Sequence, residues 1–266
     1  MQPKAIVHLT LVENFKGQIF WVAAAVGVVC LALAAILSGA ALTTEAWLFD
    51  STSYFLSDVT LFLTAALLGS FLFAKDFSNR GLAEIILVRG MNREQLLFYR
   101  LFAHCLSLLL LSLLMVLSRS IAFILPTEPA HSTFLATFYM FAFTTLKAWV
   151  ACALATFLGI HTRPVIAFLG TTALFAFGHF ATGISGITGI IDAENSPISA
   201  KVSFLLKIFR VWNPNSLVLE SFQGHWNLPT GPNLFYSLMW GIGACMVFIC
   251  AGFLSVRNRD IGSMKI

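Results

Sequence analysis

The 266-residue chain is 58% hydrophobic and only 11% charged, and its mean hydropathy is +0.86. A water-soluble domain cannot bury so much apolar surface, so this composition excludes a soluble globular protein and predicts a membrane protein. The formal net charge of +4 is small and dispersed, so we expect no nucleic-acid partner.

Residues 1–17 form the first predicted element. The stretch 4–17 is too polar to span a bilayer, but Ile6, Leu9 and Val12 recur on one side of a helical projection. This pattern is typical of an amphipathic helix that lies on the membrane surface. We therefore expect an N-terminal interfacial helix.

Six apolar runs follow, and each has about the 20 residues that a helix needs to cross a bilayer. They cover residues 19–42, 55–74, 98–125, 134–160, 165–187 and 234–256. The pattern predicts an all-α membrane protein with six transmembrane helices in a single domain, residues 1–266. An even number of crossings places both termini on the same side of the membrane.

The connection 188–233 before the last run carries a narrow polar stripe on an otherwise apolar helical pattern. The stripe consists of Ser199, Ser203, Lys207 and Arg210. It predicts a helix that is half-buried in the outer membrane interface or re-enters against the bundle. A plain interfacial anchor is the alternative.

The distribution of Lys and Arg predicts the orientation, because positively charged loops stay in the cytoplasm. Three such residues lie in the loops at one end: Lys201, Lys207 and Arg210. Eleven lie at the other end: Lys4, Lys16, Lys75, Arg80, Arg89, Arg93, Arg100, Arg163, Arg257, Arg259 and Lys265. We expect a multi-pass protein of the cytoplasmic (inner) membrane with both termini in the cytoplasm.

The most charged stretch, residues 76–95, lies between the second and third runs. Leu82, Ile85 and Ile86 share one helical face, and Asn92 is placed as the N-cap of the next helix. A short amphipathic helix between two crossings is suited to contact a partner in the aqueous phase. An ordinary basic cytoplasmic loop is the alternative.

Lys147 lies in the middle of the fourth run, where an ammonium group is costly unless it faces the bundle, water or a partner. We expect it to point inward, either as part of a transport path or as a structural tie to hydroxyls such as those of Thr144 and Thr145. His179 in the fifth run is the other transport-path candidate, with a packing histidine as the alternative. Asp58 lies near the outer end of its run, from which its side chain is expected to reach the interface.

Motifs for catalysis or cofactor binding are sparse. Residues 183–186, GISG, match the sequence around the nucleophile of rhomboid-type intramembrane proteases, but that chemistry needs a His base and the sixth run contains none. Close helix packing is the alternative reading of these glycines. There is no P-loop, no H-E-x-x-H and no C-x-x-C, so we expect no catalytic residue, no metal site and no cofactor on this chain.

Together, the interfacial helix, the six crossings, the charged loop and a basic tail containing RNRD resemble the permease subunits of the type-two ABC exporter family. The stretch AKDFSNRGLAEIILVRGMNREQLLFYR carries the most specific resemblance. It is similar to that family's acidic residue, Gly, short helix, Ser/Asn-Arg pair and basic residue, at Asp76, Gly81, residues 82–88, Asn92-Arg93 and Arg100.

The resemblance implies that residues 1–17 are the elbow helix and that the coupling segment 76–95 docks into a separate cytoplasmic ATPase. The implied ATPase-coupling residues are Asp76, Arg80, Gly81, Leu82, Glu84, Ile85, Ile86, Arg89 and Arg93. Two copies of the ATPase would bind ATP and Mg, and this chain would not be an enzyme by itself. A second permease half, favoured as a homodimer over a heterodimer, the lipid bilayer and an outer-side accessory protein are the other implied partners.

The expected function is that of the membrane-spanning subunit of an ATP-driven exporter. Lys147 is not part of the family pattern, so no substrate is carried over. The alternatives are an intramembrane enzyme built on Ser185 of GISG and a membrane assembly factor that transports nothing.

Overall fold

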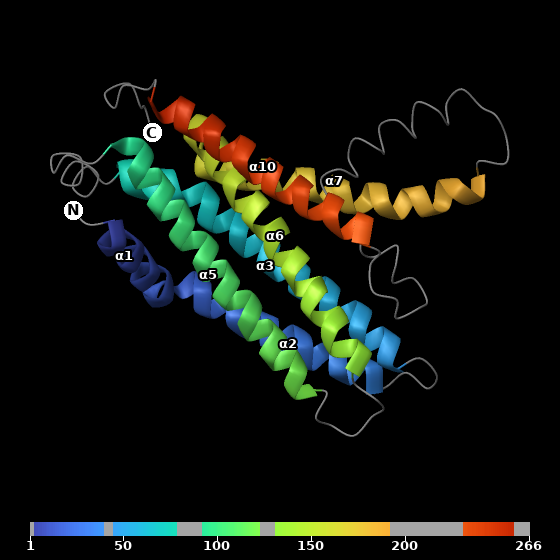
Figure 1. The fold of residues 1–266 in the computed structure, drawn as a ribbon. Coiled ribbons are helices and arrows are strands. Elements are labelled where there is room, and N and C mark those ends of the chain that lie inside the picture. Colours follow the sequence, from blue (N-terminus) through green and yellow to red (C-terminus); the bar gives the residue numbers. More distant parts are fainter. Residues whose placement is uncertain (1–2, 40–44, 79–91, 123–130, 192–230, 258–266) are drawn as a thin grey trace.

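The computed structural model describes residues 3–39, 45–78, 92–122, 131–191 and 231–257. Within these ranges the protein consists of seven helices and contains no strand. Figure 1 shows the helices α1 (Pro3–Lys16), α2 (Gln18–Gly39), α3 (Glu45–Ser78), α5 (Arg93–Ala122), α6 (His131–His161), α7 (Pro164–Ile191) and α10 (Gly231–Arg257).

Four stretches of the described helices are long and apolar enough to cross a membrane. They are Tyr54–Leu72 in α3, Arg93–Ser118 in α5, Phe141–His161 in α6 and Leu238–Arg257 in α10. Shorter apolar stretches lie in α2 and α7. The described part of the chain is therefore all-α, and its long apolar helices indicate a membrane protein, as the composition predicted. Each of the six predicted crossings lies on one of these helices, but a count of six stays a prediction.

The helices from α2 to α10 alternate in direction along the bundle, and α6 lies at its centre (Figure 1). Helix α6 packs against α3, α5, α7 and α10, and 78% of its stretch Phe141–His161 is buried. Only 17% of the stretch Leu238–Arg257 in α10 is buried. The protein core thus follows α6, while α10 presents most of its apolar surface outward, as expected for a helix that faces lipid.

Helices α3 and α6 run parallel and approach most closely at two glycines. A Cβ atom at Gly69 would collide with the carbonyl oxygen of Cys152, and one at Gly159 would lie 2.9 Å from the carbonyl oxygen of Ser70. Helix association in membranes depends on such close backbone approach, because lipid offers no hydrophobic driving force between helices. We call this contact between α3 and α6 the glycine seam.

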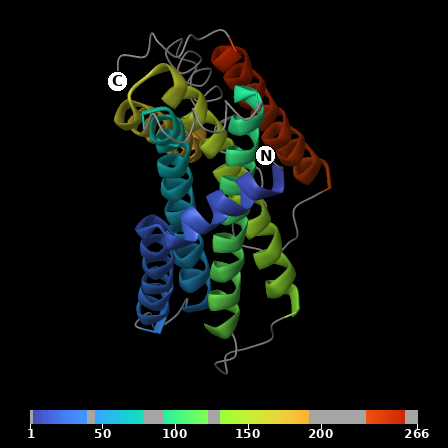
Figure 2. The ribbon, with the colours of Figure 1, turned by 90° about the vertical axis from the view of Figure 1, so that its left-hand side faces the viewer.

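Helix α1 lies obliquely across α5 (Figure 2). Its buried side chains are Ile6, Thr10 and Asn14, one on each turn, whereas Leu9 and Val12 are only partly buried. The face that packs on α5 therefore contains one of the three predicted apolar residues, Ile6, together with two polar ones, and the contact of Leu9 and Val12 with the membrane stays a prediction. The assignment of α1 as an elbow helix stays a prediction.

The predicted connection 188–233 is described only in part. Its first residues, 188–191, form the last turn of α7. The polar stripe predicted between Ser199 and Arg210 lies outside the described residues.

Candidate functional site

Three ionisable side chains from α3, α6 and α7 lie at the same depth in the bundle. At 1.5 Å of rise per residue, Asp58 and Lys147 lie about 21 Å from Leu72 and His161, at the ends of their apolar stretches. His179 lies about 22 Å from Pro164, where α7 begins at that same end of the bundle. Charged groups on three different helices can therefore meet at about the same distance from one end of the bundle.

Asp58, Lys147 and His179 do meet, and we call them the buried charge cluster. The Nζ atom of Lys147 donates a hydrogen bond to Oδ2 of Asp58 at 2.5 Å and lies 2.6 Å from Nε2 of His179. Nε2 of His179 lies 3.2 Å from the same carboxylate oxygen. The side chains of Lys147 and Asp58 are 1% and 2% exposed, whereas that of His179 is 33% exposed.

Helical periodicity explains why these side chains converge. On α3, Tyr54, Asp58 and Phe62 follow one another at four-residue intervals and so share a face. On α7, Phe175 and His179 share a face in the same way. The rings of Phe62 and Phe175 pack with centroids 4.7 Å apart, one turn from the ionic contacts. An aromatic contact therefore holds α3 against α7 next to the charge cluster.

The pairing offsets the free-energy cost of burying these charges. An isolated ammonium or carboxylate in the membrane interior is strongly unfavourable, and opposite charges with additional hydrogen bonds offset this cost. Lys147 has both a carboxylate oxygen and an imidazole nitrogen within hydrogen-bond distance. The cluster therefore links three helices through groups that no apolar side chain could replace one at a time.

The structure confirms one sequence prediction about this cluster and corrects another. Lys147 points into the bundle, as its depth predicted. Its partners, however, are Asp58 and His179, while Thr144 donates to Tyr54 and Thr145 donates to Ser112.

The Asp58 side chain does not extend outward as predicted, because it is 2% exposed and paired with Lys147 inside the bundle. On helix α3, which begins at Glu45, this side chain points toward α6. The signal that could have found the pair is depth. Asp58 and Lys147 lie at similar distances, 16 and 13 residues along two parallel crossings, from the predicted cytoplasmic ends at residues 74 and 160.

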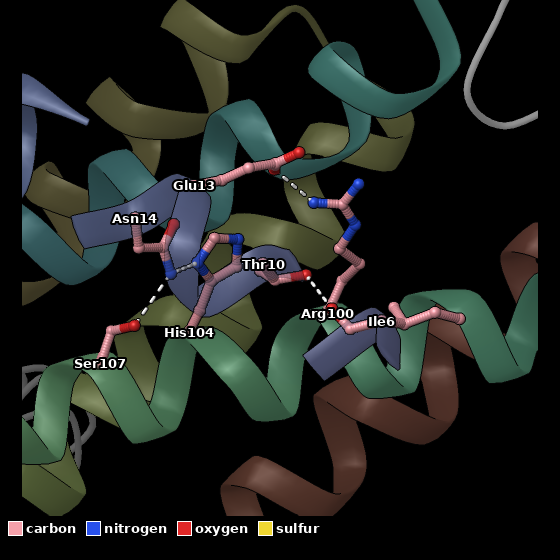
Figure 3. Close-up of polar contacts among 7 residues, drawn as sticks. All are labelled: Ile6, Thr10, Glu13, Asn14, Arg100, His104 and Ser107. Carbon is pink, nitrogen blue, oxygen red and sulfur yellow. Dashed lines mark hydrogen bonds and ion pairs between the residues drawn. The ribbon is translucent and has the colours of Figure 1, made fainter. Parts of the chain in front are cut away.

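A second polar cluster joins α1 to α5, and Figure 3 shows its side chains. Arg100 donates to Oε2 of Glu13 at 2.6 Å. Asn14 donates to Oγ of Ser107 at 2.9 Å, and its Nδ2 atom lies 2.9 Å from Nδ1 of His104. We call these five residues the α1–α5 cluster. The sequence analysis placed Arg100 at the start of a crossing but did not identify Glu13 as its partner.

The predicted ATPase-coupling residues lie mostly outside the described part of the chain. This holds for Arg80, Gly81, Leu82, Glu84, Ile85, Ile86 and Arg89. Asp76 lies in the last turn of α3, and Arg93 is the first residue of α5. The carbonyl oxygen of Asn92 accepts a hydrogen bond from the amide of Leu96 at 3.1 Å, which confirms Asn92 at the N-cap position.

The other motif of the sequence analysis, residues 183–186, forms part of the continuous helix α7. Within the described ranges, no group of three or more His, Cys, Asp or Glu side chains could hold a metal ion. The buried charge cluster is therefore the best-defined candidate site that the described residues contain.

One comparison with known proteins identifies a family. The sequence profile of a family described as "Protein of unknown function (DUF2705)" matches residues 39–262. No curated protein matches the chain. Because the profile covers most of the sequence, the chain belongs to the DUF2705 family.

Proposed function

We propose that this member of the DUF2705 family is the membrane-spanning permease subunit of an ATP-driven exporter of the type-two ABC kind. In this proposal it resides in the cytoplasmic membrane with both termini in the cytoplasm. A separate cytoplasmic ATPase binds ATP and Mg and performs hydrolysis. The chain itself moves the substrate and is not an enzyme.

The observation that carries the proposal is the path of helix α3. Its cytoplasm-facing end, in the predicted orientation, leads directly into the charged segment 79–91. From there α3 runs as one helix, without interruption, to Asp58 in the buried charge cluster. A helix transmits displacement along its axis. A force on the charged segment would therefore reach the contact of Asp58 with Lys147 and His179 inside the bundle.

The buried charge cluster supplies the two-state element that such a mechanism requires. Packed helices change between discrete arrangements rather than deforming continuously. Movement of α3 either separates Asp58 from Lys147 or carries both residues along. The position of the two charges relative to His179 on α7 differs between these outcomes. We infer that ATPase closure shifts this balance, which changes which side of the membrane the pathway faces.

The α1–α5 cluster supports the same mechanism from the other flank of the segment 79–91. Helix α5 begins at Arg93, directly after that segment, and Arg100 ties its second turn to Glu13 of α1. A displacement of α5 would therefore take α1 with it. In a complete complex, two such chains and two ATPase subunits would act together, with an outer-side accessory protein as a further candidate partner.

The proposal is tested by reconstituting the chain with an ATPase subunit that lacks membrane spans and is encoded beside it. Buried apolar side chains carry most of the energy of an interface, whereas rim charges contribute little. We expect Ile85→Asp to release the ATPase from the purified complex and to abolish ATP-dependent transport. Arg80→Ala should weaken the association only modestly.

Ala5→Asp is the matched control, because it adds the same single negative charge at an exposed position of α1. We expect it to leave the complex intact. A complex that survives Ile85→Asp, or a chain that never co-purifies with an ATPase, would contradict the proposal and favour an assembly factor.

A further inference from the structure

The contact between Lys147 and His179 determines where the imidazole carries its hydrogen. Two nitrogen atoms 2.6 Å apart need one donor and one acceptor between them. A lysine ammonium has three donors and no acceptor. With Lys147 charged and bonded to Asp58, Nε2 of His179 must therefore present its lone pair, which leaves the ring hydrogen on Nδ1.

Two charged groups of opposite sign face the Nε2 atom of His179. From α6 it faces the Lys147 ammonium, and from α3 it faces the Asp58 carboxylate at 3.2 Å. One turn from Asp58, the neutral hydroxyl of Tyr54 accepts from Thr144 at 3.5 Å. These are the titratable groups that the described parts of α3 and α6 bring to this site.

Access to the cluster is one-sided. Lys147 and Asp58 are almost completely enclosed, whereas one third of the His179 side chain is exposed. A proton from outside the bundle therefore reaches His179 before the other two groups. Histidine is also the side chain that commonly changes charge in the physiological pH range.

We propose that Nε2 of His179 is a proton-binding site whose occupation releases α7 from α6. The arriving proton forms an N–H bond at Nε2 and removes the lone pair that accepted from Lys147. The new imidazolium donates to Asp58 instead, and the charge of the cluster changes from zero to +1. Two cations would then lie side by side, so the Lys147–His179 contact cannot persist.

The position of His179 in the fold gives this change a mechanical consequence. Beyond the cluster, the C-terminal part of α7 extends away from the other helices (Figure 1). Loss of the contact to α6 leaves α7 tied to α3 at this point, through the imidazolium–Asp58 bond and the Phe62–Phe175 ring contact. Protonation therefore loosens α7 where it departs from the bundle. A proton bound at His179 would regulate the site of the proposed exporter. Only the role of this proton in transport rests on the proposed function.

The first test reads the imidazole directly in the chain alone, in lipid nanodiscs, without ATPase or substrate. Nitrogen-15 NMR of histidine-labelled protein distinguishes the two neutral tautomers from the imidazolium, and His179→Gln assigns the signal. We expect the Nδ1–H tautomer in the neutral ring and the imidazolium after acidification. An Nε2–H tautomer in the neutral ring, or a ring that acidification leaves unchanged, would overturn the proposal.

The second test measures the release of α7 by hydrogen–deuterium exchange of its backbone amides. The side-chain amide introduced by His179→Gln can accept from Lys147 but cannot take up a proton, so this variant stays locked. At about pH 5.5 we expect exchange in α7 about tenfold faster in the parent than in His179→Gln, with equal rates at about pH 8. Comparing the two proteins at one pH cancels the chemical dependence of exchange on pH.

His161→Gln is the matched control, since it removes another histidine, which contacts Ser255 at the far end of α6. It should behave as the parent does. Equal exchange in the parent and in His179→Gln at both pH values would overturn the proposal. If His179→Gln does not fold, single substitutions of the other five histidines assign the remaining signal to His179, and its tautomer in the parent still decides. A failed ATPase reconstitution leaves both measurements valid, so the two proposals fail separately.

Discussion

The buried charge cluster and the α1–α5 cluster contain ion pairs of almost the same length in different surroundings. Lys147 and Asp58 approach to 2.5 Å, and Arg100 and Glu13 to 2.6 Å. The carboxylate side chain is 2% exposed in the first pair and 26% exposed in the second. Contact distance therefore does not distinguish the pairs, but access to water does.

Access to water decides how much stability is lost when each pair is broken. When one partner of an enclosed pair is lost, the other remains charged in a medium that cannot solvate it. In the second pair the Arg100 side chain is 4% exposed and only Glu13 is in contact with water, so water solvates the carboxylate when Arg100 is lost and the net cost is small. The buried charge cluster should therefore behave as an indivisible unit, and the α1–α5 cluster as a set of separable contacts.

The largest expected effect comes from breaking the enclosed pair. Asp58→Ala leaves the Lys147 ammonium without its carboxylate inside the bundle, which should cost about 3–5 kcal/mol of unfolding free energy. Thermal unfolding of the chain in detergent, followed by circular dichroism, measures the loss.

The double variant Asp58→Leu/Lys147→Met is the control for this prediction. It removes both charges and fills the space with apolar side chains, so it should recover most of the lost stability. A double variant as unstable as Asp58→Ala would mean that the charges themselves are not the source of the loss.

A smaller effect is expected from disrupting the glycine seam, which holds α3 close enough to α6 for the buried charge cluster to form. Gly69→Leu introduces atoms that collide with the carbonyl oxygen of Cys152, and overpacking of this kind costs about 1–3 kcal/mol. The same unfolding measurement checks it. Gly243→Leu is the matched control on α10, because a Cβ atom there meets nothing within 4 Å. Equal losses in the two variants would show that the close approach is not needed.

The smallest effect is expected in the α1–α5 cluster. Glu13→Gln keeps the shape and an amide oxygen that still accepts from the buried guanidinium of Arg100, so only the charge of a 26% exposed side chain is removed and the loss should be about 1 kcal/mol. Chemical unfolding at low and high salt measures both the loss and its screening. A loss as large as that of Asp58→Ala would break the contrast between the two clusters.

The two clusters also differ in how far the sequence predicted them. The inward direction of Lys147 followed from its depth alone, because lipid penalises an unpaired ammonium wherever the neighbouring helices lie. The partnership with Asp58 did not follow, since a carboxylate near the end of an apolar run could equally well reach the interface. The contacts of Arg100 with Glu13, and of Asn14 with Ser107, were missed because they join residues far apart in the sequence.

The sequence by itself determined that this protein is a bundle of apolar helices and where those helices run, because bilayer thickness imposes one length on every crossing. It also determined that a charge within a crossing must be turned away from lipid. The tertiary structure decided which charges meet and which face of α1 is buried. Such pairings depend on the rotation and close approach of helices around their axes, which glycines such as Gly69 permit and which no single helical pattern encodes.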